Sequence, residues 1–146
     1  MSGDFLGIYE NSVHKMRVVI PAVLKNKFSA AAKETVICTL GPNNSVAIYP
    51  LDNWNALKEK LNKGDERSRT LLNNLIDFAC LEQKLEGPGR IRIGDELLKT
   101  AGIVDSVIIK GDGSYITLWN PDTFRAIREE RKQIHNKEYT PMDYKI

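Results

Sequence analysis

A short pattern occurs twice in this chain, and the repeat limits what the chain can fold into. Arg17 coincides with Arg90 when the two copies are offset by 90 − 17 = 73 positions. The apolar residues that follow then coincide in pairs: Val18 with Ile91, Ile20 with Ile93, and Leu24 with Leu97. Similarity at a fixed spacing indicates two copies of one structural unit.

Each copy predicts the same order of elements: strand, loop, strand, short helix, hairpin and helix. Apolar and polar residues alternate in the strands, and proline or glycine punctuates the turns. In the first copy we expect strands at 5–9, 17–20, 35–39 and 45–49, a polar loop at 11–16, a short helix at 21–28, and a helix from 50. In the second copy we expect strands at 81–85, 90–93, 106–110 and 115–119, a loop at 86–89, a helix at 95–101, and a helix from 120.

The helix from 50 and a second helix, which belongs to neither copy, are predicted to connect the two units. Asp65 suits the N-cap of the second helix. An apolar stripe on that helix, formed by Leu71, Leu75, Phe78 and Ala79, is interpreted as part of the core or of a subunit interface. The predicted organisation is a first repeat at 1–53, connecting helices at 54–80, a second repeat with a C-terminal helix at 81–135, and a polar tail at 136–146.

The composition is that of an ordinary globular protein. The chain has 146 residues, 42% hydrophobic and 27% charged, and a net charge of +2. This weakly basic balance is compatible with nucleic acid but does not by itself indicate it. No apolar run is long enough to cross a bilayer, and the first residues do not resemble a secretion signal. We therefore expect a cytoplasmic protein with no membrane partner.

Signatures of catalysis and of metal binding are absent from the sequence. Neither the two histidines, His14 and His135, nor the two cysteines, Cys38 and Cys80, show the spacing of a metal site. The cysteines stand in apolar segments and are interpreted as reduced core residues, in preference to a disulfide. No phosphate-binding loop, dinucleotide fingerprint or nucleophile elbow occurs. The sequence predicts no enzyme activity, no metal, no cofactor and no small-molecule substrate.

Six short motifs together resemble the MraZ family of bacterial proteins across residues 5–130. In this sequence they are Gly7-Ile8-Tyr9-Glu10, Arg17-Val18-Val19-Ile20-Pro21-Ala22, Tyr49-Pro50-Leu51-Asp52-Asn53-Trp54, Gly89-Arg90-Ile91-Arg92-Ile93, Leu97-Leu98-Lys99-Thr100-Ala101-Gly102 and Leu118-Trp119. The resemblance implies a β-rich α+β fold of two AbrB- or MazE-like swapped-hairpin units, also called a double-split β-barrel. It also implies a nucleoid-associated transcriptional repressor that forms homo-oligomeric rings and binds repeats in double-stranded DNA upstream of a division and cell-wall gene cluster.

The family pattern also carries an Asp, three residues and then an Arg in each half. Here Glu86 takes the acidic position before Arg90, and Val13 takes it before Arg17. The resemblance implies that Glu86, with Gly87 and Gly89, organises the second loop and orders Arg90. Because Val13 cannot accept a hydrogen bond, the first loop is either held in another way or looser. The DNA-binding residues implied are Lys15, Arg17, Arg90 and Arg92.

Two other interpretations remain open on the residues alone. Val13 favours an oligomeric interaction module that has lost DNA recognition. An AbrB-like antitoxin, whose partner is another protein, is the second alternative. Arginines at matched positions after matched loops favour DNA contact over charges that are merely solvated.

Overall fold

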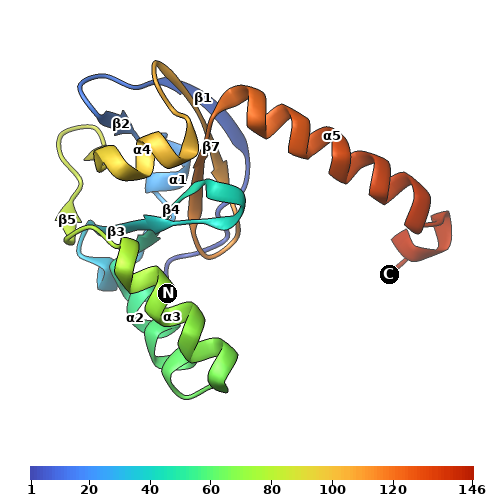
Figure 1. Ribbon diagram of the computed structural model, residues 1–146, viewed down its shortest axis with the longest axis horizontal. Coiled ribbons are helices and arrows are strands. Elements are labelled where there is room, and N and C mark those ends of the chain that lie inside the picture. The colour runs from blue at the N-terminus through green and yellow to red at the C-terminus, as the bar shows by residue number, and fades with distance from the viewer.

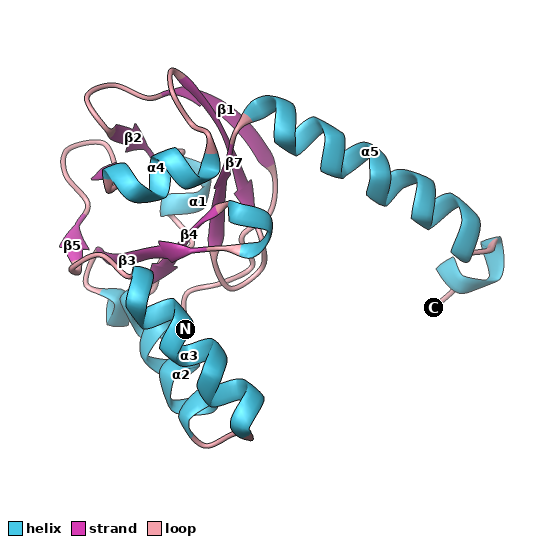
Figure 2. Ribbon diagram, in the orientation of Figure 1, coloured by secondary structure: helices cyan, strands magenta, loops and turns pink.

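Antiparallel strands from both repeats form one six-stranded sheet, and two further strands form a separate two-stranded ribbon. The computed structural model describes residues 1–146 (Figures 1 and 2). The strands are β1 (Ile8–Ser12), β2 (Arg17–Val19), β3 (Thr35–Leu40), β4 (Val46–Pro50), β5 (Gln83–Lys84), β6 (Arg90–Arg92), β7 (Ser106–Gly111) and β8 (Ile116–Trp119). The strand order in the large sheet is β1-β7-β8-β4-β3-β5, and β2 and β6 form the ribbon. The fold is therefore a mixed α+β one, as the sequence predicts.

Five α-helices and three short 3-10 helices accompany the strands. The α-helices are α1 (Ala22–Lys25), α2 (Leu51–Asn62), α3 (Glu66–Phe78), α4 (Asp95–Ala101) and α5 (Pro121–Glu138). The 3-10 helices are η1 (Ala30–Ala32), η2 (Pro42–Asn44) and η3 (Pro141–Tyr144). The α2–α3 pair extends from one side of the body, and α5 projects from another (Figure 1). No helix is both long enough and apolar enough to span a bilayer.

The two repeats exchange strands and do not form separate bodies. The first strand of each repeat pairs with the hairpin of the other: β1 with β7 of the β7–β8 hairpin, and β5 with β3 of the β3–β4 hairpin. Strands β4 and β8 pair at the centre, with Ala47 opposite Thr117. In the ribbon, Val18 lies opposite Ile91, its own repeat equivalent. The strand pairing therefore relates the two repeats to each other by an approximate twofold symmetry.

The spacing between equivalent residues changes along the repeat. It is 91 − 18 = 73 at the ribbon and 117 − 47 = 70 at the centre of the sheet. The second repeat thus has three fewer residues between these two points. The first repeat has the short helix η1 in this interval, where the second runs directly from α4 to β7.

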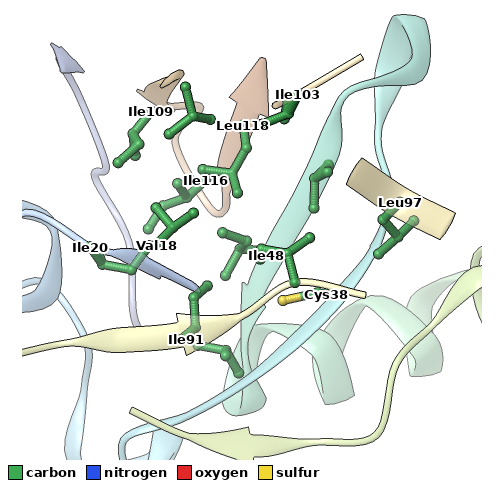
Figure 3. Close-up of a cluster of buried hydrophobic side chains, with 14 of the residues drawn as sticks. Val18, Ile20, Cys38, Ile48, Ile91, Leu97, Ile103, Ile109, Ile116 and Leu118 are labelled. Atoms are coloured by element: carbon green, nitrogen blue, oxygen red, sulfur yellow. The ribbon is translucent and has the colours of Figure 1, made fainter. Parts of the chain in front are cut away.

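The apolar pairs that define the repeat form the centre of the molecule. Val18, Ile20, Leu24 and Ile93 are fully buried, and their cluster of 17 residues draws on both repeats. Figure 3 shows the side chains of Val18, Ile48 and Ile91 converging in this cluster. Burying such side chains is the dominant favourable contribution to folding. These positions face one core that both repeats share.

Several predicted boundaries are wrong, and each has a local reason. The first strand begins at Ile8 and not at residue 5, because Gly7 has φ +104° and interrupts it. Phe5 instead forms an isolated bridge with Gly113. The predicted loop at 11–16 is shorter, since Asn11 and Ser12 pair with β7. Helix α1 covers only 22–25, β5 only 83–84, and helix α5 continues past 136 to Glu138.

The connecting helices pack on each other through a small cluster that includes Trp54 of α2. Asp65 caps α3 as predicted, accepting the Ser68 N–H at 2.9 Å. Within the single chain, Leu72 and Leu75 are buried whereas Leu71 is 47% exposed and Phe78 is 36% exposed, so only part of the predicted stripe lies in the core. The face of α3 that contains Leu72 is the one that contacts α2.

Asn120 is the N-cap of α5, and its removal should destabilise the protein. Its side-chain oxygen accepts the N–H groups of Asp122 and Thr123, and its amide nitrogen donates to the Gly102 carbonyl. We expect Asn120→Ala to lower the free energy of unfolding by about 1–2 kcal/mol. Urea denaturation measures this loss. Asn120→Asp keeps the acceptor and should recover most of it; equal losses for both variants would contradict the cap as the cause.

Candidate nucleic-acid interface

The β2–β6 ribbon places three arginines on one outward face. Its register sets Arg17 opposite Arg92 and Val19 opposite Arg90. Side chains of a strand alternate between its two faces. The central pair, Val18 and Ile91, is buried, so the residues on either side of it point away from the core. Arg90 and Arg92 are exposed, and Arg17 is half-buried.

The two loops that precede these strands are closed turns of different length. His14 and Arg17 exchange backbone hydrogen bonds of 3.0 and 2.9 Å around a two-residue turn. Both turn residues, Lys15 and Met16, have positive φ values of 51° and 63°. Such values mark the tight hairpin turn whose twist matches that of its strands. The sequence predicted a polar loop here and missed the turn, because neither residue is a glycine or an asparagine.

The second loop has one more residue within its closing pair. Glu86 and Arg90 exchange backbone hydrogen bonds of 2.9 and 2.8 Å. Gly87 and Gly89 have φ values of +51° and +114°, which favour glycine. The loops are also joined crosswise, because Ile20 donates to the Gly89 carbonyl at 2.9 Å and Ile93 donates to the Met16 carbonyl at 2.8 Å. Each repeat therefore holds the loop of the other.

Glu86 closes its loop through the backbone alone. Its carboxylate forms no hydrogen bond or ion pair, with Arg90 or with any other residue. A terminal nitrogen of the Arg90 guanidinium lies near Gly87, 3.4 Å from where a Cβ of that residue would be. The Arg17 guanidinium donates to the Lys15 carbonyl at 3.3 Å. Of these two arginines, Arg17 donates a hydrogen bond from its side chain and Arg90 does not.

Val13 holds the first loop in a way that needs no acid. Its backbone N–H donates to the Asp105 carbonyl at 2.8 Å. Its side chain is partly buried and packs against the main core cluster. Of the two alternatives that the sequence left open, the structure supports a loop anchored by packing and by a backbone hydrogen bond.

The four predicted cations gather around the ribbon without acidic partners. The ion pairs of the structure lie elsewhere, and none includes Lys15, Arg17, Arg90 or Arg92. A shallow hollow is lined by Ser12, His14, Lys15, Arg17, Val19, Glu86, Pro88 and Arg90. Arg92 is not among its lining residues, but it points outward beside Arg17. Glu86 is the one carboxylate that lines the hollow, so this surface is positively charged.

Two amide side chains that the sequence analysis missed hold the edges of the ribbon. Asn11 donates to the Val19 carbonyl at 3.0 Å. Gln83 donates to the Arg92 carbonyl at 2.8 Å and accepts the Arg92 N–H at 3.0 Å. The two carbonyls are repeat equivalents, since 92 − 19 = 73. The sequence has an amide side chain before each arginine-bearing strand, and this pattern could have indicated Asn11 and Gln83. Polar residues before a loop are too common for the pattern to identify these two.

We expect Gln83→Ala to expose the backbone of β6. The Arg92 amide hydrogen loses its only acceptor, so it should exchange with solvent faster than in the parent protein. Hydrogen exchange followed by NMR measures this directly. Gln83→Glu keeps an acceptor oxygen and should retain most of the protection. Unchanged exchange in Gln83→Ala would show that the amide does not protect β6.

No group of three or more His, Cys, Asp or Glu side chains that could hold a metal ion is present.

No family model matches the chain. Comparison with individual proteins is informative: the transcriptional regulator MraZ of Methylobacillus flagellatus is 30% identical over 115 residues, which is 77% of this chain and 77% of that protein. The chain belongs to the MraZ family.

Other MraZ proteins match at a similar level. The transcriptional regulator MraZ of Nitrosomonas eutropha is 30% identical over 109 residues, or 73% of each chain. That of Thermomicrobium roseum is 29% identical over 129 residues, or 86% of this chain and 87% of that one. The resemblance inferred from the motifs is confirmed. MraZ is a non-enzymatic family, so the prediction that this chain is not an enzyme is confirmed as well.

Proposed function

We propose that this MraZ protein is a sequence-specific DNA-binding transcriptional regulator. The observation that carries the proposal is the set of unpaired cations, Lys15, Arg17, Arg90 and Arg92, on one face of the β2–β6 ribbon. The major groove of DNA is wide enough to admit a two-stranded β-ribbon. Lysine and arginine neutralise phosphates, and arginine can also make a bidentate contact with guanine.

The proposed architecture explains why both repeats are needed. We interpret each repeat as an AbrB-like swapped-hairpin unit, supported by the pairing of each first strand with the other repeat's hairpin. The proposed boundaries are 1–53 and 81–135 for the repeats, 54–80 for the connecting helices and 136–146 for the tail. The exchange brings the two arginine-bearing strands together, which one repeat alone could not do.

Assembly into a homo-oligomeric ring is part of the proposal. One subunit offers few cations and would bind DNA weakly, whereas linked copies multiply their affinities. Strands β1 and β5 are sheet edges, and Leu81 and Val104 are 92% and 75% exposed. Such edges and apolar surfaces favour association. The proposed target is a set of repeats upstream of a division and cell-wall gene cluster, and the proposed location is the cytoplasm, on the nucleoid.

A gel-shift titration on the DNA upstream of the protein's own gene, across a salt series, tests the function. Specific binding should exceed binding to scrambled DNA. The logarithm of affinity should fall with the logarithm of salt concentration by about 0.9 per phosphate engaged. Light scattering of the same sample should give a mass above that of a dimer. An oligomer that binds neither the upstream DNA nor the scrambled DNA would favour an interaction module. Co-purification with a toxin would favour an AbrB-like antitoxin.

A further inference from the structure

The two cysteines are 80 − 38 = 42 positions apart in the sequence, yet they are neighbours in the fold. The Cys80 N–H donates to the Cys38 carbonyl at 2.9 Å. Cys38 lies in β3, and Cys80 lies just before β5, which pairs with β3 in antiparallel orientation. The paired residues of these strands are Thr35 with Lys84 and Val36 with Gln83, and the hydrogen bond between Cys80 and Cys38 continues the contact of the two segments beyond them. A disulfide requires such proximity of the two backbones.

Both cysteines contact the main core cluster. Cys38 is completely buried in the main cluster, and Cys80 is partly buried and packs against that cluster. Figure 3 shows the Cys38 sulfur among the side chains of the cluster, near Ile48 and Ile91. The shared cluster and the direct backbone hydrogen bond place the two thiols in one region of the molecule, as a bond between them requires.

The cysteine pair also contacts the residues that hold strand β6. The Cys80 sulfur lies 3.2 Å from where a Cβ of Gly94 would be, just past the end of β6. The Gln83 amide nitrogen lies 4.0 Å from the Cys38 sulfur, and this same nitrogen donates to the Arg92 carbonyl. A movement of either sulfur would disturb the packing behind the arginine-bearing strand.

We propose that Cys38 and Cys80 form a reversible intramolecular disulfide on oxidation by a peroxide, and that this bond weakens the hold of Gln83 on β6. Cys80 reacts first, because it is the more accessible thiol. Its thiolate attacks hydrogen peroxide, giving a sulfenic acid and hydroxide, which takes up the proton that Cys80 has lost. The Cys38 thiol then displaces hydroxide from the Cys80 sulfur, and its proton leaves with that hydroxide as water. Two thiols and one peroxide thus give one disulfide and two waters.

The order of the two steps agrees with the surroundings of the thiols. Burial raises the pKa of the Cys38 thiol well above its usual range, so Cys38 remains protonated until a sulfenic acid forms beside it. The reduced pair that the sequence predicted is the resting state in this proposal. Any effect on DNA rests on the proposed function, whereas the formation of the bond does not.

Mass spectrometry of the peroxide-treated full chain tests the bond. We expect an intact mass lower by two hydrogens, a digest peptide that joins Cys38 to Cys80, and full reversal by dithiothreitol. Cys80→Ser should prevent the change, and so should Cys38→Ala if it folds. Stable sulfinic acid without a crosslink, disulfides only between chains, or unchanged thiols would each overturn the proposal.

Hydrogen exchange and DNA titration of the same samples test the consequence. The Arg92 amide should exchange severalfold faster in the oxidised chain than in the reduced chain, and peroxide-treated Cys80→Ser should match the reduced chain. If the bond forms and Arg92 exchange is unchanged, the link to β6 is wrong. If the reduced chain binds no DNA, the proposed function fails, while the mass and exchange results still decide the redox pair.

Discussion

Replacing Arg17 and Arg90 together by alanine is expected to abolish measurable specific DNA binding while leaving the fold intact. Each arginine that contacts a base contributes about 1–3 kcal/mol, a factor of roughly 5–150 in affinity at about 1.4 kcal/mol per tenfold. A ring multiplies the loss, because every copy carries the change. Both side chains lie on the outward face of the ribbon, so their removal should not disturb Val18 or Ile91.

The single variants should differ, with Arg90→Ala costing more than Arg17→Ala. Arg90 is exposed and its side chain makes no hydrogen bond, so binding need not break one. Arg17 is half-buried and would have to release the Lys15 carbonyl. The measurement is the affinity of each variant for upstream and for scrambled DNA across a salt series.

Two further variants separate the possible roles of these arginines. Arg90→Lys keeps the charge but cannot make a bidentate contact, so it should lose specificity and retain the salt dependence. Arg125→Ala removes a cation that pairs with Asp122 on α5, away from the ribbon, and should leave affinity nearly unchanged. Losses in Arg125→Ala equal to those in Arg90→Ala would mean that overall charge, and not the ribbon, governs binding.

The sequence predicts which residues face the core better than it predicts which strands pair. Val18, Ile20, Ile91 and Ile93 were identified because strand alternation and burial impose a pattern on the residues themselves. No such pattern says that β1 pairs with the other repeat's hairpin, since its own hairpin offers equally apolar strands. This pairing is decided by the whole chain and not by any local pattern.

Local ambiguities of the same kind explain the smaller errors. Two apolar stripes on α3 have the same helical spacing. One contains Leu71, Leu75 and Phe78, and the other contains Leu72 and Leu75. The position of α2 selects the second stripe, and that position is not a local property. The strand expected at 5–9 begins late because Gly7 has a positive φ, which the pattern of residues alone did not indicate.

The DNA-binding role of the four cations stays a prediction, and the sequence did not show how their side chains are arranged. The matched loops identified Lys15, Arg17, Arg90 and Arg92, yet they could not show that Arg92 faces Arg17 across the ribbon. The acidic position was given a side-chain role, but Glu86 acts through its backbone. Such contacts depend on side-chain direction in three dimensions, which residue spacing does not determine.

Gly111 lies where the N-terminal segment crosses β7, and Gly111→Ala should destabilise the protein strongly. A Cβ at this position would lie 2.4 Å from the Phe5 carbonyl carbon and 2.5 Å from the Leu6 nitrogen. The segment cannot easily move away, because Gly111 donates to the Gly7 carbonyl and Phe5 exchanges hydrogen bonds with Gly113. Phe5 is also fully buried in the main core, so a shift would disturb core packing.

We expect Gly111→Ala to lower the free energy of unfolding by about 3 kcal/mol, the upper end of the usual cost of overpacking, and to lower Tm by roughly 10 °C. Thermal and urea denaturation measure both quantities. Two other glycines calibrate the effect. Gly113→Ala meets nothing within 4 Å but has φ +84°, so it should cost about 1 kcal/mol in backbone strain. Gly3→Ala has neither problem and should stay within about 0.5 kcal/mol of the parent. If Gly111→Ala is as stable as Gly3→Ala, the N-terminal segment does not cross β7 at this point, and the pairing of Phe5 with Gly113 is wrong.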